Sequence, residues 1–227
     1  MNWSDSGYLL SKNKFGENSI IVEFFTKNHG KISGIIYGAT SKKIRNYLQI
    51  GNNFHVNYTS KNENKLGYLN VEIDEILTPL FFENKKKLSC IVSTMNLVKL
   101  LTVDNQTNLD IYHLIESFYV FLKSDNWIIK LIFWELDLLR FIGYDLELTK
   151  IVSEEFINDK KFYYVLSNNE KKYVPNFLVE KNNEIDDFNQ IFSGFKLIND
   201  YMDKSILRPN NISHPKSRME FMNLIKE

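Results

Sequence analysis

Hydrophobic and polar residues alternate along the first third of the chain, and a helical spacing replaces this alternation near residue 80. Successive side chains of a strand point to opposite faces, so a period of two indicates half-buried strands. Phe54, Val56 and Tyr58, for example, alternate with polar neighbours. The pattern predicts five strands, at residues 7–12, 19–26, 31–38, 53–59 and 66–77.

Glycine is concentrated in the same segment, where seven of the nine glycines lie between residues 7 and 67. Glycine permits the bends and bulges that a small closed barrel requires. Asn28 and Gly30 supply the turn residues between the second and third predicted strands. Five strands with this spacing are typical of an OB-type β-barrel, whose strand faces and loops commonly hold single-stranded nucleic acid.

Beyond Pro79, apolar residues recur every three or four positions, which predicts helices. Asn108 is a candidate N-cap, and Gly143 is a suitable residue to end a helix. The predicted helices span residues 83–102, 109–123, 125–142 and 184–204, with a last one after Pro215, and residues 162–174 predict an isolated β-hairpin. The fold class is therefore α+β: a five-stranded OB-type barrel over residues 1–80, then a helical domain over residues 81–227 with a small hairpin insertion at about 149–180.

The charge distribution singles out a basic loop after the third predicted strand. Residues 1–70 contain nine basic residues and four acidic ones, although the whole chain has 28 of each. Cations attract phosphates, and bases stack on aromatic rings. The candidate nucleic-acid contacts are Lys27, Lys31, Tyr37, Lys42, Lys43, Arg45 and Tyr47. The alternative is that these cations only keep a loop solvated.

The sequence lacks the marks of several other classes of protein. Cys90 is the single cysteine, which excludes an internal disulfide and a multi-cysteine zinc site. The four histidines have no ligand spacing, and no phosphate-binding loop or nucleophile elbow is present. No catalytic residue, metal or cofactor is expected. No apolar run approaches a membrane span or a signal peptide, so we expect a cytoplasmic protein without a membrane partner.

A series of short motifs follows in order along the chain. Trp-x-Asp-x-Gly-Tyr-Leu-Leu occupies residues 3–10, and Phe-Thr-x-x-His-Gly-Lys occupies residues 25–31. Further motifs are Gly-Glu-Asn-Ser at 16–19, Gly-Ala-x-Ser-Lys-Lys at 38–43, Glu-Leu-Asp-Leu-Leu-Arg-Phe-Ile-Gly-Tyr-Asp at 135–145 and Ser-Arg-Met-Glu-Phe at 217–221. Their order and spacing resemble those of the RecO family of bacterial DNA repair proteins.

The resemblance implies a non-enzymatic recombination mediator with an N-terminal OB-fold and a C-terminal helical domain. Such proteins bind single- and double-stranded DNA and anneal complementary strands. With RecR they help to load the RecA recombinase onto DNA coated by single-stranded DNA-binding protein. The tail of that coating protein usually docks on the helical domain, so it is a further expected partner.

The chain departs from the family pattern at two places. Some relatives carry a cysteine zinc module where this chain has the cysteine-free residues 149–180, which predicts a metal-free hairpin held by packing. Family members often have an arginine where Phe133 lies here, which bears on docking of the acidic tail. Apolar walls beside a cation suit such a tail. The candidate partner-binding residues are Lys130, Phe133, Trp134, Arg208, Lys216 and Arg218.

Two other functions stay open from the sequence. An RNA-binding OB module would present the same cations and aromatic rings, because the attraction to phosphate is common to both nucleic acids. An enzyme with a site built from scattered residues would show a cluster of perturbed titratable groups in a cleft.

Overall fold

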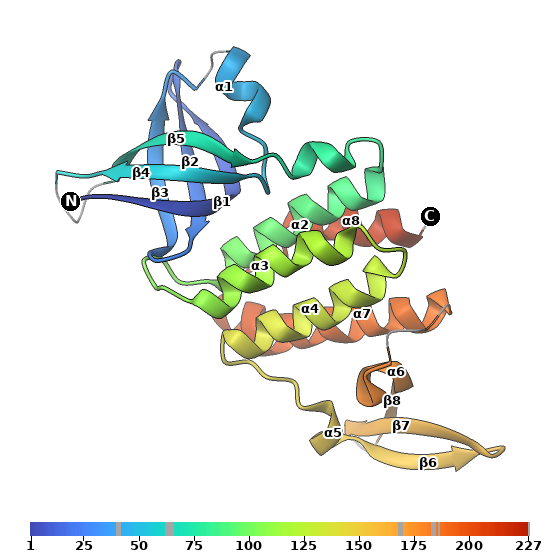
Figure 1. Cartoon of the computed structure of the whole chain (residues 1–227). Coiled ribbons are helices and arrows are strands. Elements are labelled where there is room, and N and C mark those ends of the chain that lie inside the picture. Colours follow the sequence, from blue (N-terminus) through green and yellow to red (C-terminus); the bar gives the residue numbers. More distant parts are fainter. Residues whose placement is uncertain (40–41, 62–65, 168–169, 183–184, 186, 227) are drawn as a thin grey trace. The chain divides into compact units, whose positions relative to one another are not determined.

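In the computed structural model, the chain folds into two compact units (Figure 1). One unit comprises Met1–Glu116 and Pro215–Glu227, and the other comprises Ser117–His214. The structure describes residues 1–39, 42–61, 66–167, 170–182, 185 and 187–226. Each unit buries an apolar core of its own.

Five strands close into a barrel in the first unit (Figure 1). They are β1 (Asn2–Phe15), β2 (Ser19–Thr26), β3 (Gly30–Tyr37), β4 (Asn53–Thr59) and β5 (Gly67–Glu75). The order around the barrel is β1-β2-β3-β5-β4, and β4 pairs back to β1. All pairs are antiparallel except β3 with β5. The predicted five-stranded OB-type barrel is confirmed.

Strand β1 is the longest because it pairs with its two neighbours along successive parts of its length. It pairs with β4 as far as Tyr8 and with β2 from Gly7 onward. The register shifts between Leu9 and Ser11, and an irregularity of this kind bends a strand. The bend lets one strand close both sides of the barrel.

A short helix, α1 (Lys42–Tyr47), stands where the sequence analysis expects a basic loop. Ile44 and Tyr47 lie on one helical face and pack, with the buried Leu48, against the apolar core of the barrel. The prediction of a loop is therefore wrong for these residues. Their apolar spacing, which the charge pattern obscures, makes the segment an amphipathic helix.

Helices complete the first unit. They are a 3₁₀ turn η1 (Thr78–Phe81), α2 (Lys85–Leu101), the start of α3 (Leu109–Leu122) and α8 (Lys216–Lys226). The Asn108 side chain accepts a hydrogen bond from the amide of Ile111 at 3.1 Å, which confirms the predicted N-cap of α3. Helix α2 packs against both α8 and β1.

The second unit contains the rest of α3 and most of the remaining helices. They are α4 (Trp127–Phe141), α5 (Leu148–Ile151), α6 (Asn176–Glu180) and α7 (Phe188–Met202), followed by a π-helical turn (Asp203–Leu207) and a 3₁₀ turn (Arg208–Asn210). Gly143 follows α4 with a φ of 89°, a backbone conformation that glycine adopts without steric cost. This residue ends the helix as the sequence predicts.

A three-stranded sheet replaces the isolated hairpin expected in the second unit. Strands β7 (Lys160–Ser167) and β8 (Glu170–Val174) form the predicted pair, and β6 (Ser153–Ile157) adds to the other edge of β7. The prediction of only two strands is therefore wrong. β6 escapes sequence analysis because its residues are nearly all exposed and show no alternation.

The compact units differ from the domains expected from periodicity. The first unit continues past residue 80 to Glu116 and takes in α8, because α2 joins both the barrel and α8. A domain boundary near residue 80 therefore stays a prediction. Among the described residues, no helix combines the length and the apolar character that crossing a membrane requires.

Candidate nucleic-acid interface

Two exposed tyrosines form a stacked pair on the outside of the barrel. Tyr37 ends β3, Tyr68 lies in β5, and their side chains are 61% and 43% exposed. The ring centroids are 5.4 Å apart and the ring planes differ by 30°. A hydrogen bond with Tyr68 raises the pKa of the Tyr37 hydroxyl above its ordinary value of 10.0, so this hydroxyl stays neutral at physiological pH. The pair is an exposed, uncharged aromatic platform to which a base can add.

The predicted cations lie on different elements at opposite ends of β3, so they do not all surround this platform. Lys27 is exposed in the turn between β2 and β3, with its Nζ 6.0 Å from the ring centroid of Tyr112. Lys42, Lys43 and Arg45 belong to α1, which follows β3. The side chains of these three residues lie outside the described part of the chain, so their phosphate contacts stay a prediction.

Lys31 does not present its charge to a ligand. Its Nζ donates hydrogen bonds to the carbonyl oxygens of Lys99 at 2.9 Å and Thr102 at 2.6 Å, and forms an ion pair with Asp104 at 3.1 Å. The side chain is only 12% exposed. The last carbonyls of a helix lack intrahelical donors, and a cation there also favours the helix dipole. Lys31 therefore caps α2, and we remove it from the predicted contacts.

Tyr47 is also directed away from solvent. It is half-buried against the barrel core, with its ring centroid 6.3 Å from that of Phe54. A ring that fills the end of the barrel offers no free face to a base. Tyr47 is therefore not a candidate for stacking on a base. Tyr68, which is exposed and which sequence analysis missed, is the candidate instead.

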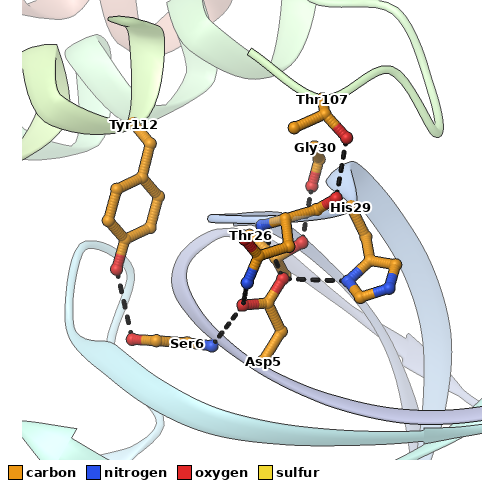
Figure 2. A network of polar contacts seen from close by, with 8 residues as sticks. Asp5, Ser6, Thr26, His29, Gly30, Thr107 and Tyr112 are labelled. Atoms are coloured by element: carbon orange, nitrogen blue, oxygen red, sulfur yellow. Dashed lines mark hydrogen bonds and ion pairs between the residues drawn. The ribbon is translucent and has the colours of Figure 1, made fainter. Parts of the chain in front are cut away.

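A buried carboxylate organises the turn between β2 and β3 (Figure 2). Asp5 accepts hydrogen bonds from the backbone amides of Ser6 and Asn28, from the Asn28 side chain and from Nδ1 of His29. These distances lie between 2.7 and 2.9 Å. Burial raises the pKa of Asp5, but the hydrogen bonds from His29, Asn28 and Ser6 together lower it below its ordinary value. Asp5 is therefore a charged, fully satisfied anchor for the turn.

Three aromatic rings lie beside this anchor. The Trp3 ring is stacked on His29, with centroids 3.8 Å apart and planes 8° apart, and on Tyr58, at 4.8 Å and 13°. Trp3 and Tyr58 face each other across the β1–β4 pair. Sequence analysis notes Trp3, Asp5 and His29 only as parts of motifs. Their proximity depends on the closure of the barrel.

The predicted partner-binding residues occupy different environments. Trp134 and Arg218 are only 3% and 1% exposed, so neither presents a side chain to a partner. Neither is therefore kept as a candidate partner-binding residue. Lys130 is half-buried and donates a hydrogen bond to Ser124 Oγ at 3.1 Å. Arg208 is paired with Asp203 at 2.6 Å. Lys216 is exposed on α8 and lies 3.4 Å from Glu220.

Phe133 lines a pocket of about 490 Å³ in the second unit. Other lining residues are Leu136, Asp137, Arg140, Asp145, Leu146, Glu147, Leu148, Thr149, Leu178 and Lys181. Burial raises the pKa of Asp137, and Asp145 adds to the increase, whereas the opposing Arg140 and Lys181 reduce it. The pocket therefore combines apolar walls with two cations that sequence analysis did not select.

Two further groups of the barrel unit, Tyr8 and Tyr112, have a pKa that is shifted mainly by burial. Burial raises the pKa of Tyr8 and of Tyr112, whose rings lie 5.4 Å apart, and the Tyr112 hydroxyl donates a hydrogen bond to Ser6 Oγ at 3.2 Å. Among the described residues, no three or more His, Cys, Asp or Glu side chains are grouped to hold a metal ion.

The order of the five barrel strands, with α1 between β3 and β4, defines an OB-type domain, and a helical domain follows it. Two family descriptions match the chain: "Recombination protein O N terminal" over residues 1–76 and "Recombination protein O C terminal" over residues 83–193. The chain therefore belongs to the RecO family of DNA repair proteins.

Individual relatives agree with this assignment. The DNA repair protein RecO of Ehrlichia chaffeensis is 29% identical over 152 residues, which cover 66% of this chain and 62% of the relative. The chain thus spans less than two thirds of that relative's length. The DNA repair protein RecO of Bartonella bacilliformis is 25% identical over 243 residues, which cover 100% of this chain and 97% of the relative.

Proposed function

We propose that this protein is a non-enzymatic recombination mediator that binds single- and double-stranded DNA and anneals complementary strands. With RecR, it would help to load RecA onto DNA. The observation that supports DNA binding best is the exposed Tyr37–Tyr68 stack on an OB-type barrel, in a part of the chain with an excess of cations. Such stacking is tolerant of sequence, which suits a protein that must act on any broken strand.

The tyrosine pair supplies the decisive test. Changing Tyr37 and Tyr68 together to Ala removes the platform, and base–aromatic stacking contributes about 1–3 kcal/mol per base. We expect a loss of about 5- to 150-fold in affinity for single-stranded DNA, measured by fluorescence anisotropy, with a parallel loss in the rate of strand annealing.

Phe82→Ala is the matched control, because Phe82 is 55% exposed in the same unit but lies outside the barrel. Equal binding by the double variant and the wild type would contradict the proposed surface. Preference for an RNA oligomer of the same sequence would favour the alternative of an RNA-binding module.

The pocket in the second unit supports a second proposal, docking of the acidic tail of single-stranded DNA-binding protein. Such a tail ends in an apolar residue and a carboxylate, which match the leucine walls and the Arg140 and Lys181 cations. Asp137, Asp145 and Glu147 also line the pocket, so the net charge opposes an acidic ligand. Binding should therefore be weak, with a dissociation constant on the order of micromolar or poorer.

For this pocket, we expect Arg140→Glu and Lys181→Glu each to weaken tail-peptide binding at least about tenfold in a calorimetric titration. Reversing one charge replaces attraction by repulsion at the carboxylate. Lys196→Glu is the control, because Lys196 lies on α7 and does not line this pocket. Unchanged binding by both pocket variants would place the tail elsewhere.

A further inference from the structure

The stack of Trp3, Tyr58 and His29 carries an inference that rests on the proposed function and extends it. Tyr58 and His29 are both nearly parallel to the Trp3 ring, at 4.8 and 3.8 Å. Two rings so close to the same centroid would overlap if they shared one face. They therefore lie on opposite faces, and Trp3 is sandwiched between them.

The two ends of this three-ring stack differ. A Cβ atom added to Gly67 would lie 2.3 Å from Cζ of Tyr58, so the backbone of β5 covers the ring at that end. The His29 side chain is 31% exposed. The open end of the stack is therefore the imidazole of His29.

The imidazole is held in place by the Asp5 carboxylate at its edge. Nδ1 of His29 is bonded to Asp5 at 2.9 Å, and the Asp5 side chain is only 2% exposed. Because Asp5 is ionised and accepts this bond, Nδ1 carries the hydrogen. Nε2 has no hydrogen-bond partner among the described residues, and in Figure 2 it points away from Asp5. A ring with a fixed plane and a free edge is preorganised for a ligand.

The surroundings indicate what kind of ligand fits. Lys27 is exposed in the same turn, two residues before His29, and supplies a cation for a phosphate. Gly67, which covers Tyr58, directly precedes Tyr68 of the exposed tyrosine pair. Consecutive side chains of a strand point to opposite faces, so the Trp3 stack, which packs against the barrel core, and the exposed tyrosine pair lie on opposite sides of the first residues of β5. An unpaired base with its phosphate matches an aromatic face beside a cation.

We propose that His29 is a second base-stacking position, at which a nucleotide of the single strand bound at Tyr37 and Tyr68 adds to the end of the Trp3 stack. Asp5 is the positioning residue that fixes the imidazole plane. The base stacks on the outer face of His29, and Lys27 neutralises the adjoining phosphate.

Substitutions of His29 test this site. His29→Ala removes the terminal ring, whereas His29→Phe keeps a flat ring but loses the bond to Asp5. Each is titrated with oligothymidylate of about 16 nucleotides, the upper end of the site size of one OB-fold. A 2-aminopurine base within the oligomer reports stacking by quenching of its fluorescence, and a ribose version of the oligomer compares RNA with DNA.

We expect His29→Ala to lose about 5- to 150-fold in affinity and part of the quenching. His29→Phe should retain binding within about threefold, because stacking does not need the imidazole edge. His55→Ala is the matched control, since His55 is an exposed histidine of the same barrel, and it should bind like the wild type. Circular dichroism at the assay temperature establishes that each variant is folded.

Two results would overturn the proposal: wild-type binding and quenching by folded His29→Ala, or equal weakness of the Ala and Phe variants. If His29→Ala is unfolded, the Phe variant decides alone, and weak binding by it counts against stacking. The Tyr37/Tyr68 double variant separates the two proposals. Its loss of binding, together with unaffected His29 variants, would refute the second position and leave the proposed function in place.

Discussion

Gly30→Ala is expected to destabilise the protein by about 3–5 kcal/mol, the largest effect of any single methyl group in the barrel unit. Gly30 has a φ of 67°, where an L-residue is strained by about 1–2 kcal/mol. An added Cβ would also lie 1.9 Å from the carbonyl oxygen of Gln106. That oxygen belongs to the backbone, so the whole connection between α2 and α3 must move.

Moving this connection breaks several interactions at once. Asn105 donates its amide hydrogen to the Lys31 carbonyl at 2.8 Å, and Thr107 Oγ1 donates to the Asn28 carbonyl at 2.7 Å. The ion pair between Lys31 and Asp104 lies in the same segment. Each lost contact of this kind costs about 1 kcal/mol.

Gly16→Ala is the matched control for this substitution. Gly16 has nearly the same φ, 65°, but nothing lies within 4 Å of the position that an added Cβ would take. It should therefore show the backbone strain alone, about 1–2 kcal/mol, in urea denaturation. If the two variants lose equal stability, the close approach of Gln106 has no energetic importance.

Asp5→Asn is expected to cost about 1.5–3 kcal/mol at neutral pH, the second large effect. The amide keeps the size of the side chain but removes the charge and one acceptor. Asp5 accepts from the Asn28 amide at 2.7 Å and from His29 Nδ1 at 2.9 Å through the same oxygen. An amide nitrogen there would leave both donors without an acceptor.

The stability that Asp5→Asn loses should depend on pH, in a direction set by the lowered pKa of Asp5. The folded protein holds the carboxylate ionised below the unfolded pKa of about 3.9, so its contribution to stability is complete above that value. The contribution is lost as pH falls through the lower pKa of the folded state. The difference between wild type and Asp5→Asn should thus be constant from about pH 7 to 5 and shrink below about pH 4.

Denaturation at several pH values measures this difference. Asp74→Asn serves as the control, because Asp74 is exposed on β5 of the same barrel. A gap between wild type and Asp5→Asn that stayed constant to about pH 3, or that matched the Asp74 variant, would contradict the role of Asp5 as an ionised anchor.

Local patterns alone determined most of the regular structure. Alternation located all five barrel strands, because a half-buried strand must place every second side chain in the core. Asn108 and Gly143 predicted helix ends because capping and positive φ are properties of single residues. Short motifs in a fixed order indicated the family.

The tertiary structure decided what each polar or aromatic side chain does. Lys31 and Lys27 are equivalent basic residues in the sequence, yet one caps α2 and the other is exposed, because only the fold brings the end of α2 to Lys31. Tyr47 fills the barrel end and Tyr37 faces outward for the same reason. Strand β6 exists because β7 offers it an unpaired edge.

The candidate sites, too, were predictable from the sequence only in part. Cations and tyrosines near β3 were predictable, since composition and sequence neighbours indicate phosphate and base contacts. The stack of Trp3, Tyr58 and His29 joins residues from β1, β4 and a turn, and the pocket joins Arg140 with Lys181. Their sequence separation carries no signal in a single chain. Closure of the barrel and packing of the helices bring these groups together, because burial of the apolar faces fixes which surfaces meet.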